Sequence, residues 1–119
     1  MKEFVTKLSA RKGSSKDYRI FNCIDVGKYS LSIQASSTHY CTPRELLSPE
    51  FYSSKEMAIF KEDGWIAITK SSIFRAFPRF NELMSRADGH FSNGDNSGRV
   101  VFGYVPVDLI EDLYQYLKS

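Results

Sequence analysis

The sequence has few of the features that mark secreted, stapled or membrane-bound proteins. Its 119 residues include only two cysteines, Cys23 and Cys41, which is too few for a disulfide scaffold and indicates free thiols in a reducing compartment. No run approaches the ~20 apolar residues that span a bilayer, and the N-terminal stretch MKEFVTKLSARKGSS lacks the apolar core of a signal peptide. We therefore expect a cytoplasmic protein that does not cross a membrane.

The sequence also lacks a strong net charge and the short motifs of common enzymes. A formal net charge of +2 is too small to give the single-sign field of a general nucleic-acid binder. The glycine-rich phosphate loop, the dinucleotide fingerprint, the serine-hydrolase elbow and the His-Glu-x-x-His motif do not occur. Their absence excludes the enzyme classes that depend on them, and we expect no cofactor.

The composition is that of a folded globule. Hydrophobic residues make up 42% of the chain and charged residues 25%, and the length fits one domain over residues 1–119. Aromatic residues are abundant, with seven tyrosines, nine phenylalanines and one tryptophan. A small core does not need so many rings, so we expect some of them at the surface.

Period-two alternation predicts a mostly antiparallel sheet of roughly five or six strands. The clearest strand is Tyr29–Ala35, and a turn at Asp25–Lys28 joins it to the preceding strand in a hairpin. A second hairpin is predicted around Gly64. The other expected strands are Glu3–Leu8, Asp17–Ile24, Glu56–Phe60, Trp65–Thr69 and Arg99–Val105.

Two helices are predicted late in the chain, packed on one face of this sheet, which gives an α+β fold. The first follows Ser72, where Pro78 leaves two alternatives open: a kink inside one helix, or a short helix that begins near the proline. The second opens at Pro106, with Ile110, Leu113 and Tyr114 in its buried stripe.

The segment from Ser36 to Ser54 is expected to be a long loop with one helical turn, and long loops in compact domains are often functional. Tyr40, Arg44, Phe51 and Tyr52 are the candidate partner-binding residues, because tyrosine, tryptophan and arginine carry much of the binding energy at interfaces. We expect the basic residues Arg11, Lys12 and Lys16 to steer a partner. A second irregular loop, Asp88–Gly98, is interpreted as a mobile surface turn.

His39 and Cys41 would share one face of an extended strand, which permits a thiol–imidazole pair. Together with Cys23 and His90 they also supply four ligands of the type that zinc takes, although not in the close pairs of structural zinc sites. The interpretation we prefer has no catalytic residues and no metal. A metal- or thiol-dependent enzyme is the third alternative.

Nucleic-acid binding is the second alternative. It rests on the basic N-terminal loop and on an arginine-lined helix face that could follow phosphates; the arginines are Arg75, Arg79 and Arg86. Any amphipathic surface helix can present solvated arginines opposite its apolar stripe, so this pattern does not distinguish nucleic-acid binding from an ordinary solvated face.

Several stretches resemble short uncharacterised proteins encoded by bacteriophages and prophages. The similar stretches are Ser32–Ser36, His39–Arg44, Tyr52–Phe60, Gly64–Trp65 and Gly103–Val107. The resemblance covers about half of the chain in separate pieces and carries no catalytic residue. It implies a phage accessory protein, a class that includes inhibitors of host defence such as anti-CRISPR proteins.

The loop and the resemblance together predict a non-enzymatic α+β protein that binds a host protein or complex and, as the resemblance implies, inhibits it. The partner-binding surface would be the loop from Ser36 to Ser54.

Overall fold

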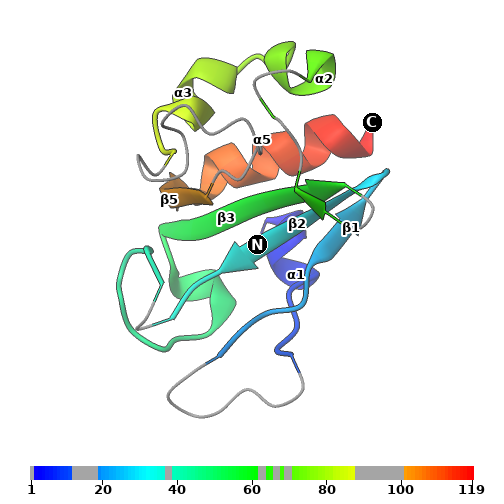
Figure 1. The fold of residues 1–119 in the computed structure, drawn as a ribbon. Coiled ribbons are helices and arrows are strands. Elements are labelled where there is room, and N and C mark those ends of the chain that lie inside the picture. Colours follow the sequence, from blue (N-terminus) through cyan, green and yellow to red (C-terminus); the bar gives the residue numbers. More distant parts are fainter. Residues whose placement is uncertain are drawn as a thin grey trace.

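The computed structural model describes residues 2–11, 19–36, 39–61, 64–65, 68, 71–87 and 101–119. The elements are α1 (Glu3–Thr6), β1 (Ile24–Val26), β2 (Tyr29–Gln34), the 3-10 helix η1 (Pro49–Phe51), β3 (Ser54–Lys61), β4 (Gly64–Trp65), α2 (Ser72–Arg75), α3 (Phe80–Met84), β5 (Val101–Pro106) and α5 (Val107–Lys118). Figure 1 shows the sheet at the centre of the molecule, with α5 lying along it and α2 and α3 beyond α5.

The sheet is antiparallel, and β3 is its organising strand. The order is β1-β2-β3-β4, and β5 also pairs with β3, so β3 has β2 along one edge and both β5 and β4 along the other. The predicted α+β class is thus confirmed. Within the described residues four strands are longer than two residues, fewer than the five or six expected, because β4 comprises just Gly64 and Trp65 and the N-terminal segment is not a strand.

Both predicted hairpins form. In the first, β1 and β2 pair through Val26↔Tyr29, and Gly27 takes a positive φ of 61°, which the tight turn requires. In the second, β3 and β4 pair through Lys61↔Gly64. Strand β2 keeps the predicted alternation, because Tyr29, Leu31 and Ile33 are buried while the serines between them are only partly covered.

The predicted first strand, Glu3–Leu8, is wrong, because this segment contains helix α1. Phe4 and Val5 are consecutive and both buried, which a strand with one solvated face does not allow. The backbone N–H of Phe4 donates to Oε1 of Glu111 on α5 at 3.0 Å, so α1 is held against the C-terminal helix.

The segment around Pro78 contains two short helices and not one. Helix α2 ends at Arg75 and α3 begins at Phe80, with the proline in the connection between them. Proline has no N–H to donate to the preceding turn, which explains why the helix ladder is interrupted there. The apolar periodicity continues across the break, so Phe74, Phe77 and Leu83 all enter the core.

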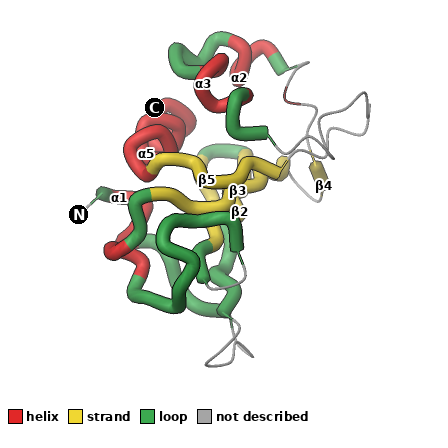
Figure 2. The backbone as a smooth tube through the Cα atoms, turned by 90° about the vertical axis from the view of Figure 1, so that its left-hand side faces the viewer, coloured by secondary structure: helices red, strands yellow, loops and turns green. Residues whose placement is uncertain are grey.

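Figure 2 shows α1 and α5 on the same side of the sheet, with α2 and α3 above it. The prediction of two helices on one face is corrected: the described residues form four α-helices. Helix α5 carries its predicted apolar stripe, with Leu109, Ile110, Leu113 and Tyr114 buried. The main core joins this stripe to the inner faces of β2, β3 and β5.

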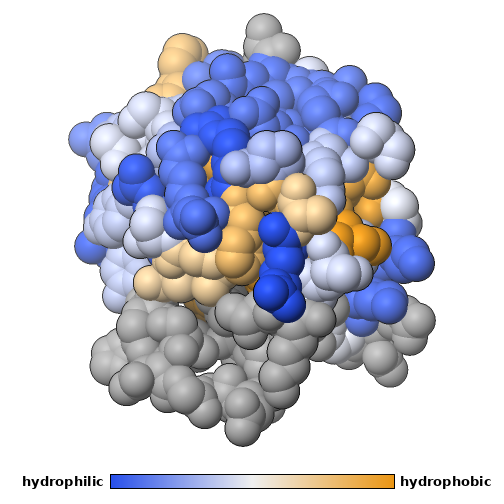
Figure 3. Space-filling model, turned by 90° about the horizontal axis from the view of Figure 1, so that it is seen from above, coloured by the Kyte–Doolittle hydropathy of each residue, from blue (hydrophilic) through white to orange (hydrophobic). Residues whose placement is uncertain are grey.

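The end of the molecule above α2 and α3 mixes polar and apolar surface. Figure 3 shows hydrophobic atoms in a central stretch bordered by hydrophilic ones. A hollow of about 240 Å³ at this end is lined by residues that include Phe77, Pro78 and Tyr116, and Ile73 is 38% exposed. The patch is small and broken by charged groups, as is normal for a protein surface.

Candidate functional site

The loop between β2 and β3 has a small core of its own. Ala35, Cys41 and Tyr52 are buried together, with Leu47 packed against them. The hydroxyl of Tyr52 donates to the carbonyl of Glu45 and accepts the N–H of Leu47 at 2.7 Å, so it closes the loop onto itself. Tyr52 is only 4% exposed, and its prediction as a surface anchor is corrected: its ring fills the interior of the loop.

Lys55 lies underneath this loop and is fully buried. Its ammonium group donates to the carbonyl of Pro49 at 2.6 Å and sits 4.5 Å from the centroid of the Tyr52 ring. Among the described residues Lys55 forms no ion pair with a carboxylate. Burial of the charge lowers the pKa of Lys55 to about 8. The loop is therefore fastened to β3 by a buried cation.

Arg19 fastens the other side of the loop. Its guanidinium donates to the carbonyl of Ala35 at 2.8 Å and to the hydroxyl of Tyr52 at 3.3 Å, and it stacks 4.5 Å from the centroid of the Phe21 ring. Of the predicted steering residues, Arg11 is exposed, whereas Lys12 and Lys16 lie outside the described residues.

The most distinctive surface feature is a stacked pair of tyrosines. Tyr40 and Tyr104 are 44% and 41% exposed, and their ring centroids lie 5.8 Å apart with an interplanar angle of 29°. The two rings come from the long loop and from β5. We refer to Tyr40 and Tyr104 as the tyrosine pair.

Backbone contacts fix the tyrosine pair. The N–H of Tyr104 donates to the carbonyl of Tyr40 at 2.9 Å, and the N–H of Tyr40 donates to Oε2 of Glu56 at 2.9 Å. A Cβ at Gly103 would come within 3.3 Å of the Tyr40 Cβ, so the close approach favours glycine there. A local irregularity in the β3–β5 register lies between Lys55 and Met57, next to these contacts.

Tyr104 is also conformationally strained. Its φ of 51° is in the left-handed region, where a bulky side chain costs on the order of 1 kcal/mol or more. Strain of this kind persists only where surrounding contacts impose it, and it is concentrated at binding and catalytic sites. The strained residue is one that presents its ring to solvent.

Arg44 completes the surface. It is exposed, and its guanidinium carbon lies 5.5 Å from the centroid of the Tyr40 ring. Two of the predicted anchors, Tyr40 and Arg44, are thus brought together. Phe51 is 64% exposed on η1, but none of the ring contacts among the described residues includes it.

The geometry around Cys41 does not resemble that of an activated thiol. Cys41 is buried, and its Sγ donates to the carbonyls of Ser36 at 3.2 Å and Pro43 at 3.3 Å. Burial raises the pKa of this thiol, opposite to the shift that a nucleophile needs. His39 instead places Nδ1 2.7 Å from the Ser36 hydroxyl, and burial lowers the pKa of its imidazole.

The candidate metal ligands do not assemble in the part of the chain that the structure describes. No group of three or more His, Cys, Asp or Glu side chains able to hold a metal ion is found there. Cys23 is exposed and Cys41 is buried. His90 and the loop Asp88–Gly98 lie outside the described residues.

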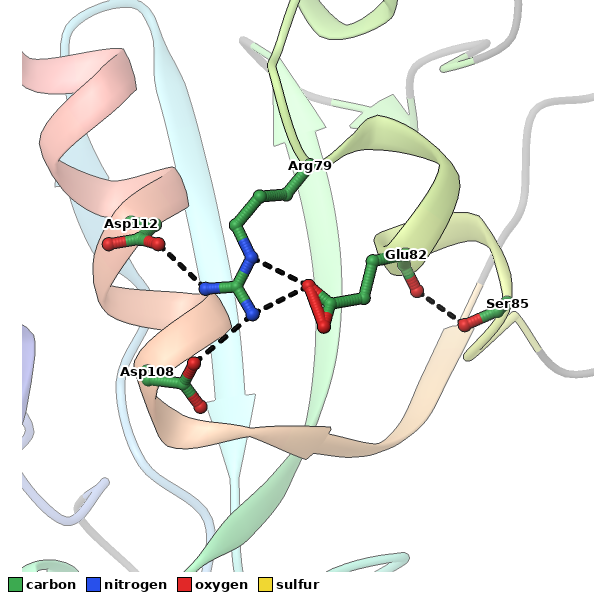
Figure 4. A network of polar contacts seen from close by, with 5 residues as sticks. All are labelled: Arg79, Glu82, Ser85, Asp108 and Asp112. Atoms are coloured by element: carbon green, nitrogen blue, oxygen red, sulfur yellow. Dashed lines mark hydrogen bonds and ion pairs between the residues drawn. The ribbon is translucent and has the colours of Figure 1, made fainter.

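The arginine-lined helix face is partly neutralised. Figure 4 shows Arg79 surrounded by Glu82, Asp108 and Asp112, and its guanidinium nitrogens lie 2.5, 3.1 and 2.6 Å from the three carboxylates. The carboxylates raise the pKa of Arg79. A guanidinium held in this way has few donors left for phosphate. Arg75 and Arg86 are exposed.

Sequence reasoning missed Tyr104 as a member of the site. The available signal was Gly103, because a glycine inside a β-rich run often marks the close approach of another part of the chain. That signal gives no indication of which residue approaches.

Comparison with known proteins identifies no relative: no family model, no curated protein sequence and no solved structure matches the chain. Within the described residues, no helix is long and apolar enough to cross a membrane.

Proposed function

We infer that this protein is a non-enzymatic accessory protein of phage type that binds a host protein or complex in the cytoplasm and inhibits it. The tyrosine pair and Arg44 form the centre of the contact surface, and Phe51 contributes at η1. The observation that carries this proposal is the exposed stacking of Tyr40 on Tyr104. The stacking is kept although the backbone of Tyr104 is strained, and Gly103 leaves room for the close contact with Tyr40.

The physical argument concerns the cost of binding. Tyrosine rings supply a large contact area with few rotatable bonds, and rings that are already stacked lose little freedom when a partner covers them. Tyrosine and arginine are enriched among the residues that dominate interface energetics. Two exposed tyrosines with an arginine over one of them fit such a centre. The resemblance to phage accessory proteins supports the inhibitory role.

Nucleic-acid binding remains the second candidate, and a metal- or thiol-dependent enzyme is the third. The ion pairs of Arg79 weaken the argument for a phosphate-tracking helix face. The bonding of Cys41 to backbone carbonyls weakens the argument for a reactive thiol.

Affinity capture from a bacterial host lysate, followed by binding measurements with the purified partner, tests the proposal. Tyr104→Gly removes a ring and also removes the strain of the positive φ, which glycine adopts freely. We therefore expect the stability to change by less than about 1 kcal/mol while the affinity for the partner falls by more than about tenfold. The combined Tyr40→Ala and Arg44→Glu variant should lose binding as well. Ile73→Ala, at an exposed apolar residue on α2, serves as the matched control and should bind normally.

The proposal fails if no host protein is retained, or if the retained protein binds the Tyr104→Gly variant as tightly as the wild type. Loss of function of the host partner on addition of this protein would establish inhibition. An equal loss with the binding-deficient variant would contradict the assigned surface.

A further inference from the structure

We propose that the partner segment bound at the tyrosine pair is acidic, with a carboxylate that accepts hydrogen bonds from Arg44 and a neighbouring apolar side chain that lies on the rings. This inference rests on the proposed function and specifies the chemistry of the partner at the same surface.

Arg44 is available for such a contact. Its guanidinium carbon lies over the Tyr40 ring, and among the described residues no carboxylate lies within ion-pair distance of the guanidinium. Arg79, by contrast, is engaged by three carboxylates. A guanidinium placed over a ring without an ion-pair partner keeps N–H donors for a ligand, and two of these donors match a carboxylate in a bidentate pair.

The position of Arg44 gives the contact a defined direction. The backbone of Tyr40, whose ring lies beneath Arg44, is fixed on both sides. Its N–H donates to the Glu56 carboxylate and its carbonyl accepts the N–H of Tyr104. Arg44 itself follows a short turn that Cys41 anchors from inside through Sγ and the carbonyl of Pro43. A carboxylate bound by Arg44 would therefore place its own neighbouring residue beside exposed rings that do not have to rearrange.

The backbone of a second arginine, Arg86, lies close to the tyrosine pair. The carbonyl of Arg86 accepts the N–H of Gly103 at 2.9 Å, so the chain at Arg86 runs directly beside the residue that precedes Tyr104. The Arg86 side chain is exposed and makes no ion pair with another described residue. Arg44 and Arg86, which form no ion pair within the described part of the chain, favour a segment with more than one acidic residue.

The nearby carboxylates argue for a peptide over a nucleic acid. Glu56 bonds to the backbone of Tyr40, and Glu45 is exposed directly after Arg44. The backbone of a nucleic acid carries a negative charge at every nucleotide and would be repelled by both carboxylates, whereas a peptide can present its own carboxylates only to the arginines. Positive charge at the centre with negative charge beside it gives electrostatic selectivity for a defined acidic segment.

Selection of a random linear peptide library on the full-length protein tests the inference. We expect the selected peptides to contain aspartate or glutamate next to an aromatic, proline or aliphatic residue. Synthetic copies should lose more than about tenfold in affinity for Arg44→Glu, a typical cost for an arginine at the centre of an interface. Arg75→Glu, which changes the same residue type on α2, is the matched control and should bind them normally. Circular dichroism confirms that both variants are folded.

The inference is overturned if the selected peptides lack acidic residues, if they bind Arg44→Glu as well as the wild type, or if no peptide is enriched on the wild type relative to the Arg44→Glu protein. Single-stranded oligothymidine binding that Arg44→Glu or Tyr104→Gly abolishes would identify a nucleic acid as the occupant. Self-association lost in Arg44→Glu would identify a second copy of the chain. A captured host protein that requires Tyr104 but not Arg44 would overturn this inference and leave the proposed function standing.

Discussion

Replacing the buried Lys55 with methionine should stabilise the protein at neutral pH. Methionine has a similar length and no charge, so it can occupy the same space under the loop. The pKa of Lys55 falls from an ordinary value of 10.5 to about 8, which corresponds to roughly 3 kcal/mol of stability lost to the buried charge. The variant also loses the hydrogen bond to the Pro49 carbonyl, at a cost of about 1 kcal/mol. We expect a net gain of about 2 kcal/mol.

The stability difference between the methionine variant and the wild type should depend on pH. Below about pH 8 Lys55 is protonated in both the folded and the unfolded protein, and it adds no slope. Between that pH and 10.5 the folded protein releases the proton while the unfolded chain keeps it, so the folded state binds fewer protons and stability rises with pH. The advantage of the methionine variant should therefore shrink over this range and change sign at its upper end.

Urea unfolding of both proteins, followed by circular dichroism from about pH 7 to about pH 10.5, measures the effect. Burial also raises the pKa values of Cys41 and Tyr114. Subtracting the two curves removes the contribution of Tyr114, whereas the charge of Lys55 lowers the pKa of Cys41, so the difference curve includes that coupling. Lys61→Met, at an exposed lysine of the same strand, is the matched control and should show no such change. A methionine variant that is less stable than the wild type by the same amount at every pH would refute the reasoning.

Three further predictions concern the supports of the fold and the site. Gly103→Ala places a Cβ 3.3 Å from the Tyr40 Cβ; it should cost about 1 kcal/mol and alter the near-ultraviolet dichroism, and an unchanged spectrum would contradict the assigned contact. Gln34→Leu removes the amide that bonds to both the N–H and the carbonyl of Phe21. It should lower the free energy of unfolding measured in urea by about 2 to 3 kcal/mol, and an unchanged value would contradict these two hydrogen bonds. Arg79→Met should cost no more than about 1 kcal/mol, and the cost should fall with added salt; a salt-independent loss would argue against the ion pairs.

Local patterns in the sequence were sufficient for the elements that local forces determine. The alternation in Tyr29–Ala35 predicts β2 because one face of that strand is buried along its whole length. The segment Glu3–Leu8 was assigned wrongly for a related reason. Phe4 and Leu8 are spaced by four, so the same short run satisfies a helical period as well as an alternating one. Six residues are too few to separate these periods when packing against α5 decides the outcome.

The candidate site could be predicted only in part. Tyr40 and Arg44 lie close in sequence, and their position in a long polar loop indicates a surface. The partner ring, Tyr104, comes from a distant strand, and its place depends on the register of β5 against β3 and on the irregularity there. No local pattern carries that information. The position of Tyr52 in the long loop predicts an exposed ring, whereas the small core that buries it forms only when the loop closes.

The departures from ordinary folding rules cluster around one surface. Lys55 is a buried cation without a carboxylate partner among the described residues, Tyr104 adopts a left-handed φ, and Gly103 approaches the Tyr40 side chain closely. The first two features lower stability, while β2 and α5 follow the expected patterns. A sequence under selection for stability alone would have a methionine and a glycine at the first two positions. The buried cation, the strained tyrosine and the close glycine contact all support the same loop and its exposed rings, which is what the proposed binding role of this surface requires.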